Sequence, residues 1–151
     1  MNICVYGASS DLIDRIYLDA GRKLGQRMAE RGHGLVFGAG ATGMMGAAVR
    51  GAAEKGGRSI GVAPRFFDQP GVLYENCSEM IFTETMRQRK EIMEQRSDGF
   101  IMTPGGIGTY EEFFEILTLK QLGRHEKPIG ILNESYLEFY EKLKENKPWN
   151  M

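Results

Sequence analysis

The sequence contains only two cysteines and two histidines among its 151 residues. Cys4 and Cys77 lie far apart in the chain and show none of the spacings that are typical of a metal site. Each lies in or beside an expected strand, so we interpret both as buried free thiols. This composition fits a reducing cytoplasm best, and we expect no metal and no cofactor.

Long apolar runs and an excess of one charge are also absent. No apolar segment is long enough to span a bilayer. Residues 1–7 lack a basic region and are typical of a strand rather than a signal peptide. The 19 basic and 20 acidic residues give a net charge of −1, which favours no non-specific partner. We therefore expect neither a nucleic acid nor a membrane as partner.

Glycine, in contrast, is abundant, with 20 residues that cluster after apolar runs. The length suits one domain over residues 1–151 with one core. Apolar runs predict strands at 2–6, 35–37, 59–63, 80–82, 99–102 and 129–132. Helical spacing predicts helices from Leu12 to Arg31, from the 38–46 loop to about Lys55, at 84–96, at 110–122, and around Tyr136, Phe139, Tyr140 and Leu143.

Strands that are continuous apolar runs and alternate with helices indicate an α/β fold. Such strands form a parallel sheet that helices cover on both faces. Right-handed crossovers then favour a doubly wound, Rossmann-like, mostly parallel sheet. Ligands of these sheets bind beyond the carboxyl ends of the strands, where the glycine turns of this sequence fall.

The stretch from Thr103 to Glu112 joins an apolar strand to a helix expected from Tyr110. Its glycines allow close backbone approach, and the free N–H groups of a helix N-terminus favour a phosphate. Glu111 and Glu112 are expected in the first helical turn, where carboxylates repel a phosphate. We therefore expect one of them to serve another part of the ligand.

A second glycine loop, Gly38-x-Gly40-x-x-Gly43, matches the dinucleotide-binding fingerprint in letters only. That fingerprint follows the first strand, and an acidic residue ends the next strand. Here the loop follows the second strand, and Ser59–Ala63 contains no acidic residue. We interpret the loop as a tight turn packed against the sheet, with contact to another part of a nucleotide left open.

The expected helix at 84–96 places two cations toward the protein interior. Met86, Ile92 and Met93 define its apolar face, and Arg89 and Lys90 fall inside or beside it. Buried cations need anionic partners. Three readings remain open: an ion pair with Glu111 or Glu112, a Lys90 side chain that reaches water, or a bound phosphate, which Arg suits.

Other polar residues give weaker signals. His33 and His125 are typical of surface turns. Ser9 and Ser10 lack the G-x-S-x-G elbow and a histidine partner, which argues against a serine hydrolase. Met44 and Met45 are interpreted as core residues, although they could line a base pocket.

The segment Pro104–Glu112 reads P-G-G-x-G-T-x-x-E, and it resembles the signature of the Lonely Guy (LOG) family of cytokinin riboside 5′-monophosphate phosphoribohydrolases. Gly7–Ser10, Phe37–Gly46 and Met86–Lys90 resemble further motifs of this family, so the resemblance extends over essentially the whole chain. It implies a homodimeric hydrolase that splits an adenosine-type 5′-monophosphate into free base and ribose 5-phosphate.

The resemblance also assigns residues. It gives catalysis to Arg89 and Glu112 and phosphate contact to the turn that ends at Thr109. Glu112 or Glu111 would stabilise an oxocarbenium-like state or activate water, and Arg89 would hold phosphate or polarise the leaving base. The alternative is a non-catalytic nucleotide carrier or sensor. The expected substrate-binding residues are Gly105, Gly106, Gly108, Thr109, Lys90, Met86, Glu111, Gly7, Ser9, Gly40 and Gly43.

The sequence departs from the family pattern at a few positions. Arg87 stands where the family often has histidine, but helical spacing turns it away from Arg89. Ala39 replaces a loop glycine. Phe113, Phe114 and Leu117 suit either a dimer interface or the core. Family members are often labelled lysine decarboxylases, yet no lysine here has a context that suggests a pyridoxal phosphate Schiff base.

Overall fold

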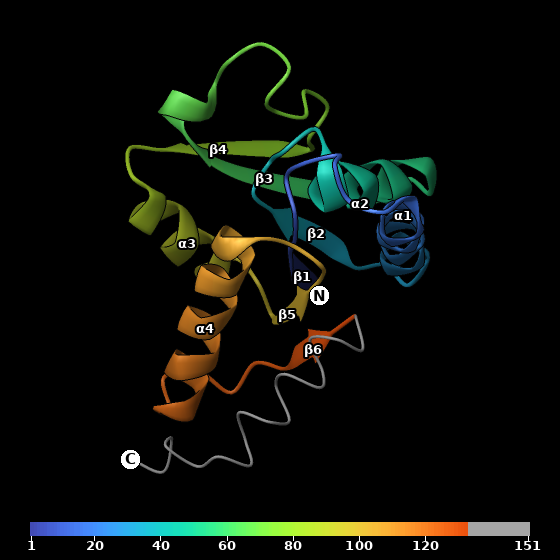
Figure 1. The fold of residues 1–151 in the computed structure, drawn as a ribbon. Helices are drawn as coiled ribbons and strands as arrows, with labels where there is room; N and C mark the ends of the chain where they lie inside the picture. Colours follow the sequence, from blue (N-terminus) through green and yellow to red (C-terminus); the bar gives the residue numbers. More distant parts are fainter. Residues whose placement is uncertain (133–151) are drawn as a thin grey trace.

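Six parallel strands form one sheet in the computed structural model, which describes residues 1–132 (Figure 1). The helix expected around Tyr136 to Leu143 lies outside these residues. The sheet order is β4-β3-β2-β1-β5-β6. The strands are β1 (Asn2–Tyr6), β2 (Gly34–Phe37), β3 (Ser59–Pro64), β4 (Glu79–Thr83), β5 (Gly99–Met102) and β6 (Ile129–Ile131).

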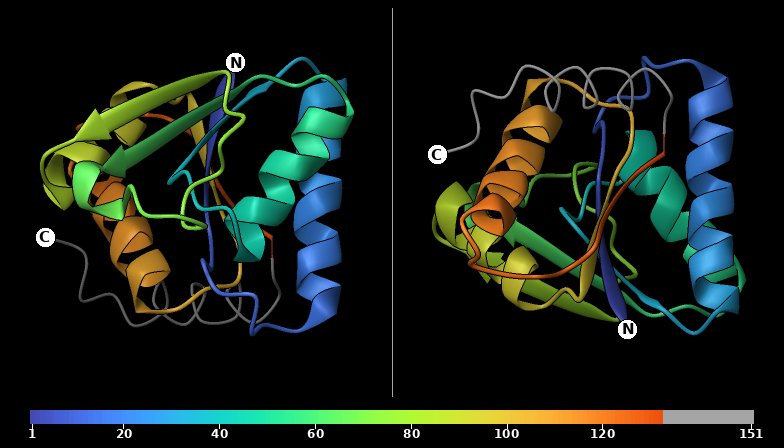
Figure 2. Two further views of the ribbon diagram at one scale, coloured as in Figure 1. Left: turned by 90° about the horizontal axis from the view of Figure 1, so that it is seen from above. Right: turned by 90° about the horizontal axis from the view of Figure 1, so that it is seen from below.

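Four α-helices and one 3₁₀ turn connect the strands. They are α1 (Arg15–Glu30), α2 (Gly43–Glu54), η1 (Arg65–Phe67), α3 (Met86–Gln95) and α4 (Ile107–Gln121). Helices α1 and α2 cover one face of the sheet, and α3 and α4 cover the other (Figure 2). The predicted α/β fold is therefore confirmed. Within residues 1–132, no helix is both long and apolar enough to cross a bilayer.

Alternate residues of the central strand β1 supply the two cores. Val5 packs toward α1 and α2 in a cluster with Met28 and Ala48. Cys4 and Tyr6 point to the opposite face, in the cluster that also contains residues of α3 and α4. Since β1 is buried on both faces, it reads as a continuous apolar run.

The strand order reverses between β1 and β5, and this switch point positions the candidate site. The two loops that leave these strands are joined, because the Ala8 N–H donates to the Pro104 carbonyl over 3.0 Å. The Thr103 hydroxyl donates to the Tyr6 carbonyl over 2.8 Å. A Cβ at Gly7 would lie 2.2 Å from the Thr103 Oγ1, so only glycine fits there.

Helix α1 begins three residues later than predicted. Asp14 is its N-cap and accepts a hydrogen bond from the Ile16 N–H. Leu12 and Ile16, which we took for the start of the apolar stripe, are 96% and 68% exposed. The stripe was misplaced because small residues form much of the buried face of this helix, which comprises Gly21, Gly25 and Met28.

Helix α4 begins at Ile107 with Gly106 as N-cap, three residues earlier than predicted. Glycine has a low helix propensity, so Gly108 made Tyr110 look like the first helical residue. Glu111 and Glu112 consequently lie in the second turn, and the expectation that they occupy the first turn is wrong. Their repulsion of an anion at the helix end is weaker than we expected.

Two polar residues also differ from expectation. Cys4 is fully buried as predicted, but Cys77 is only half-buried; both are free thiols. His125 is more than a surface-turn residue. Its Nδ1 accepts from the Lys127 N–H, its Nε2 lies 2.9 Å from the Ile116 carbonyl, and its ring packs on Phe100. The histidine therefore joins the end of α4 to the β5 side of the sheet.

Candidate active site

Arg89 lies at the carboxyl ends of β2 and β3, where backbone carbonyls hold it. Its side chain is 5% exposed. The Nε–H donates to the Val62 carbonyl over 3.0 Å, and Nη2 donates to the Gly38 carbonyl over 2.9 Å. The guanidinium carbon lies 5.4 Å from the centroid of the Phe67 ring, a cation–π contact. The guanidinium is thus fixed on several sides.

The local sequence explains how Arg89 reaches this position. Thr85 and Gln88 form a capping box that fixes the start of α3. Arg89 follows within the first turn and faces the sheet. A Cβ at Gly38 would lie 1.9 Å from the Arg89 Nη2, so glycine at this position makes room for the guanidinium.

The charge of Arg89 lacks a direct partner among residues 1–132. Burial lowers the pKa of Arg89, while the negative charge of Glu112 opposes that effect. No carboxylate in this part of the chain forms an ion pair with it. A guanidinium has five N–H donors, and two carbonyls do not use them all. The arrangement favours a bound anion or a polar ligand atom.

Glu112 is half-buried on α4. Burial raises its pKa to about 7, and the charges of Arg89 and Lys90 lower it while those of Glu111 and Glu115 raise it. A carboxyl group that titrates near neutral pH can accept and donate protons in one catalytic cycle.

Two buried residues of β1 complete the surroundings of Glu112. Burial raises the pKa of Cys4 and of Tyr6, and the negative charge of Glu112 adds to both effects. Both groups therefore stay neutral near pH 7. Tyr6 was not among the residues predicted for the site.

Lys90 forms the ion pair that we considered as one alternative. Its Nζ lies 2.5 Å from Glu111 Oε1 and 2.8 Å from Glu115 Oε2. The partner is therefore Glu111, together with Glu115, and not Glu112. Lys90 and Glu111, both predicted to bind substrate, contact each other here.

The glycines in the turn before α4 and in its first helical turn differ in what surrounds them. A Cβ at Gly105 would lie 2.1 Å from the Thr109 Oγ1, whereas a Cβ at Gly106 or Gly108 would meet nothing within 4 Å. Gly106 has a φ of −94°, which other residues adopt readily, and Gly108 is also outside the left-handed region. Neither packing nor backbone conformation requires these two glycines, so they leave an open surface at a helix N-terminus.

The start of α2, in contrast, is closed by the chain itself. The Gly43 N–H donates to Asp11 Oδ1 over 2.7 Å, and the Met44 N–H donates to the Ala8 carbonyl over 2.8 Å. A carboxylate thus occupies the place where the dinucleotide fingerprint would hold a pyrophosphate. This geometry favours the tight-turn interpretation of the Gly38–Gly43 loop, and Gly43 has no N–H to offer a ligand.

The remaining predicted residues lie at the same edge of the sheet. Ser9 is exposed, and its carbonyl accepts a hydrogen bond from the Thr42 hydroxyl. Gly40 is buried and pairs with Leu73 in an isolated bridge. Met86 is 37% exposed, and its sulfur lies 3.9 Å from the Arg89 Nη1. Met44 and Met45 are core residues, as interpreted from the sequence.

Two departures from the family pattern have structural counterparts. Arg87 is exposed, on the side of α3 away from the buried Arg89, as helical spacing predicted. Ala39 has a φ of 65°, the left-handed conformation that glycine adopts most readily. Phe67, which contacts Arg89, is a second site residue that the sequence did not predict. Its signal was the aromatic pair Phe66-Phe67 directly after a strand that ends in proline.

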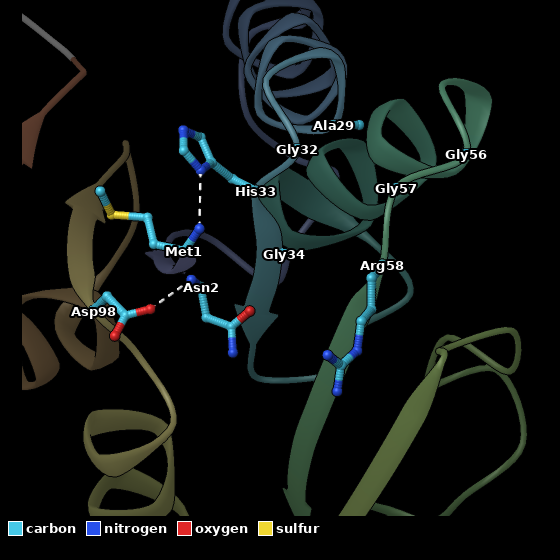
Figure 3. Close-up of a pocket in the computed structure, with 10 residues that line it drawn as sticks. All are labelled: Met1, Asn2, Ala29, Gly32, His33, Gly34, Gly56, Gly57, Arg58 and Asp98. Carbon is cyan, nitrogen blue, oxygen red and sulfur yellow. Dashed lines mark hydrogen bonds between the residues drawn. The ribbon is translucent and has the colours of Figure 1, made fainter.

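A separate cavity of about 530 Å³ lies at the opposite edge of the sheet, by the amino ends of β1 and β2 (Figure 3). Asn2, Gly34 and Asp98 line it, and the Asn2 N–H donates to Asp98 Oδ2 over 2.8 Å. Helices α1 and α2 end beside it, and helix C-termini repel anions. None of the predicted site residues lines this cavity. Within residues 1–132, no group of His, Cys, Asp and Glu is placed to hold a metal.

Comparisons with known proteins place these features in a family. A family model described as "Possible lysine decarboxylase" matches residues 45–147. Cytokinin riboside 5′-monophosphate phosphoribohydrolase LOG2 of Arabidopsis thaliana is 38% identical in an alignment that covers 93% of this chain and 68% of that protein. The chain belongs to the Lonely Guy family.

Other Lonely Guy proteins match at a similar level. LOG5 of Arabidopsis thaliana is 39% identical, and the probable phosphoribohydrolase LOGL3 of Oryza sativa subsp. japonica is 40% identical. The alignments cover 87% and 86% of this chain but only 58% and 62% of those proteins. Among solved structures, the molybdenum cofactor carrier protein of Chlamydomonas reinhardtii matches with a TM-score of 0.77 and 27% identity, over 95% of this chain and 84% of that one.

Proposed function

We propose that the chain is a phosphoribohydrolase that cleaves the N-glycosidic bond of adenosine-type 5′-monophosphates, including cytokinin ribosides. The products are a free base and ribose 5-phosphate. One observation carries the proposal: a buried Arg89 without an ion-pair partner in residues 1–132 interacts with a half-buried Glu112 whose pKa is about 7. An open glycine turn at the same edge offers a place for the 5′-phosphate.

The proposed mechanism assigns phosphate binding to the start of α4 and proton transfer or charge stabilisation to Glu112. The N–H groups at the start of α4, beside Gly106 and Gly108, bind the 5′-phosphate. Glu112 follows Gly108 by one helical turn, roughly 6 Å along the axis, so its carboxylate reaches toward the sugar. It takes a proton from water as the oxygen attacks C1′, or stabilises the oxocarbenium-like state. The electrons of the glycosidic bond leave with the base, which takes up a proton.

Arg89 has two candidate tasks in this mechanism. It can bind the phosphate or polarise the departing base. Its fixed position between two carbonyls and Phe67 suits either, because little side-chain entropy is lost when a ligand binds. A lysine decarboxylase activity has no support, since Lys90 is held by two carboxylates and offers no free amine for a Schiff base.

Base release from AMP and from isopentenyladenosine monophosphate tests the proposal. We expect the Glu112→Gln variant to lose about 10²- to 10⁴-fold in rate, the usual contribution of a general acid–base. Glu75→Gln, at an exposed loop position, serves as control and should keep the wild-type rate. A folded Glu112→Gln variant with full activity would contradict the assignment.

The non-catalytic alternative gains some support from the structural similarity to a protein titled a molybdenum cofactor carrier. A carrier or sensor on this fold would bind nucleotides at saturable sites and release no base. The same assay separates the two functions. The raised pKa of Glu112 favours the enzyme, because binding an anion does not need a carboxyl group beside it.

We further propose a cytoplasmic homodimer of a single nucleotide-binding α/β domain over residues 1–151. Phe113 is 3% exposed and belongs to the core, which leaves the half-buried Phe114 and Leu117 as interface candidates. Sedimentation equilibrium tests the dimer, and a mass of one chain in solution would contradict it.

A further inference from the structure

Two neighbouring cations of α3 are held in different ways. Lys90 contacts Glu111 and Glu115 of α4 at 2.5 and 2.8 Å, whereas Arg89 is held by carbonyl groups. The Lys90 side chain is 13% exposed, but its two carboxylate partners are 58% and 45% exposed. The lysine thus draws two solvent-facing carboxylates to one point between the helices.

The arrangement of charges on α4 makes this contact important. Glu111 and Glu115 are four residues apart on one helix, where like charges repel each other. Glu112 follows Glu111 directly, so three carboxyl groups lie within one turn. The Lys90 charge offsets this repulsion, and the neighbouring cation Arg89 has no ion-pair partner in residues 1–132 and interacts with the charge of Glu112.

We propose that Lys90 is a positioning residue of the hydrolase: its clamp on Glu111 and Glu115 keeps both carboxylates away from Arg89 and leaves Glu112 as the carboxyl group that works with it. This inference rests on the proposed function. It gives Lys90 and Glu111 a supporting task in place of the substrate contact predicted from the sequence.

The charges of the clamp also affect the pKa of Glu112. Arg89 and Lys90 lower its pKa, and Glu111 and Glu115 raise it. Removing the Lys90 charge takes away one cation and exposes Glu112 to two uncompensated anions, so both changes disfavour the carboxylate form. The groups that face Glu112 are Arg89 and Lys90 of α3, Glu111 and Glu115 of α4, and Cys4 and Tyr6 of β1, the last two of which stay neutral.

The pH profile of base release from AMP tests the proposal in the full-length chain. In Lys90→Met we expect the acid limb of kcat/KM to move to higher pH by about half a unit or more. Lys90→Arg keeps the charge and should keep the wild-type limb. Lys55→Met removes an exposed pair with Glu30 and serves as a control that should cause no shift.

A rescue variant separates charge balance from packing. The triple variant Lys90→Met, Glu111→Gln, Glu115→Gln removes the clamp and its two anions together, so we expect its acid limb to return toward the wild-type position. The double variant Glu111→Gln, Glu115→Gln leaves Lys90 charged and should shift the limb to lower pH. If Lys90 only packs, Lys90→Met should leave the acid limb in place, and the triple variant would have no shift to reverse.

A second readout does not depend on activity. Carbon-13 NMR of the Glu112 carboxyl, assigned with Glu112→Gln, gives its pKa directly in the wild type and in each variant. If the wild-type chain released no base, the proposed function would fail, yet the NMR titration would still test the clamp. An unchanged Glu112 pKa in Lys90→Met, or in the double variant, overturns the inference.

Discussion

Gly105, Gly106 and Gly108, at the start of α4, differ in what surrounds them. Gly105 lies against Thr109 and the Ala8 backbone, so the fold itself requires glycine there. Gly106 and Gly108 face open space. We propose that glycine at these open positions, where no left-handed backbone requires it, leaves room for a ligand to approach the backbone closely.

Alanine at these positions separates stability from binding. Gly108→Ala should raise the free energy of unfolding by about 0.5–1 kcal/mol, because alanine favours the helix, and should raise the KM for AMP about tenfold. Gly105→Ala should instead lower the melting temperature. Thermal unfolding and steady-state kinetics measure both effects. A Gly108→Ala variant with an unchanged KM would exclude phosphate contact at this position.

The helical spacing of apolar residues was enough to predict that the Arg89 and Lys90 side chains face the protein interior, and the structure confirms that prediction. The spacing could not show which groups the two side chains bind. The Arg89 acceptors are carbonyls of Val62 and Gly38, which depend on where β2 and β3 end in space. The Lys90 partners depend on where α4 starts. That start was predicted too late because Gly108 has a low helix propensity.

At the scale of elements, the packing of α1 on α2 depends on glycine. A Cβ at Gly25 would lie 2.0 Å from the Ala48 carbonyl oxygen, and a Cβ at Gly51 would lie 2.0 Å from the Arg22 carbonyl oxygen. The two backbones therefore approach as closely as they can. A search for apolar side chains misses such a surface, which is why the start of α1 was predicted from Leu12 and Ile16, two exposed residues.

Two substitutions in α1 test this close approach. Gly25→Ala should destabilise the protein by about 1–3 kcal/mol, the usual cost of overpacking, although alanine normally favours a helix. Gly21→Ala is the matched control, because its Cβ would meet the flexible end of Met44 at 3.0 Å and the Ala47 Cβ at an ordinary contact distance of 3.5 Å, but no backbone atom within that range. Urea unfolding should show a loss for Gly25→Ala and little change or a gain for Gly21→Ala. Equal effects would mean that the helices can move apart without cost.

At the scale of the molecule, the alternation of apolar strands and helices was enough to predict the doubly wound sheet. The crossover rule also limited the sheet topology. It did not fix which strand lies at the centre, because every described strand reads as an apolar run. The reversal between β1 and β5, which brings Ala8 to Pro104, became known only from the structure.

The stability of the whole chain should depend on pH through Glu112. Its pKa is about 7 in the folded protein against 4.5 in the unfolded chain. Between these values the folded state binds more protons, so the free energy of unfolding falls as pH rises, by up to about 3 kcal/mol above pH 7. Glu112→Gln should therefore be more stable than the wild type at pH 8 and similar to it near pH 4.5.

Urea unfolding at several pH values measures this difference. Glu75→Gln, at an exposed loop position, is the control and should track the wild type throughout. A Glu112→Gln difference that is the same at pH 5 and pH 8 would show that the carboxyl group is not held in a desolvated site. The expected gain at pH 8 would accompany loss of activity, as is common where a site is built at the expense of stability.

The Asp11 carboxylate at the start of α2 has a consequence for which nucleotides the chain can accept. A molecule with two separate phosphate-binding ends would have to displace a side chain of the protein from the Gly43 N–H before its second anion could bind. Asp11 would thus compete with a second anion for the Gly43 N–H. We therefore expect the chain to favour ligands that carry their negative charge at one end.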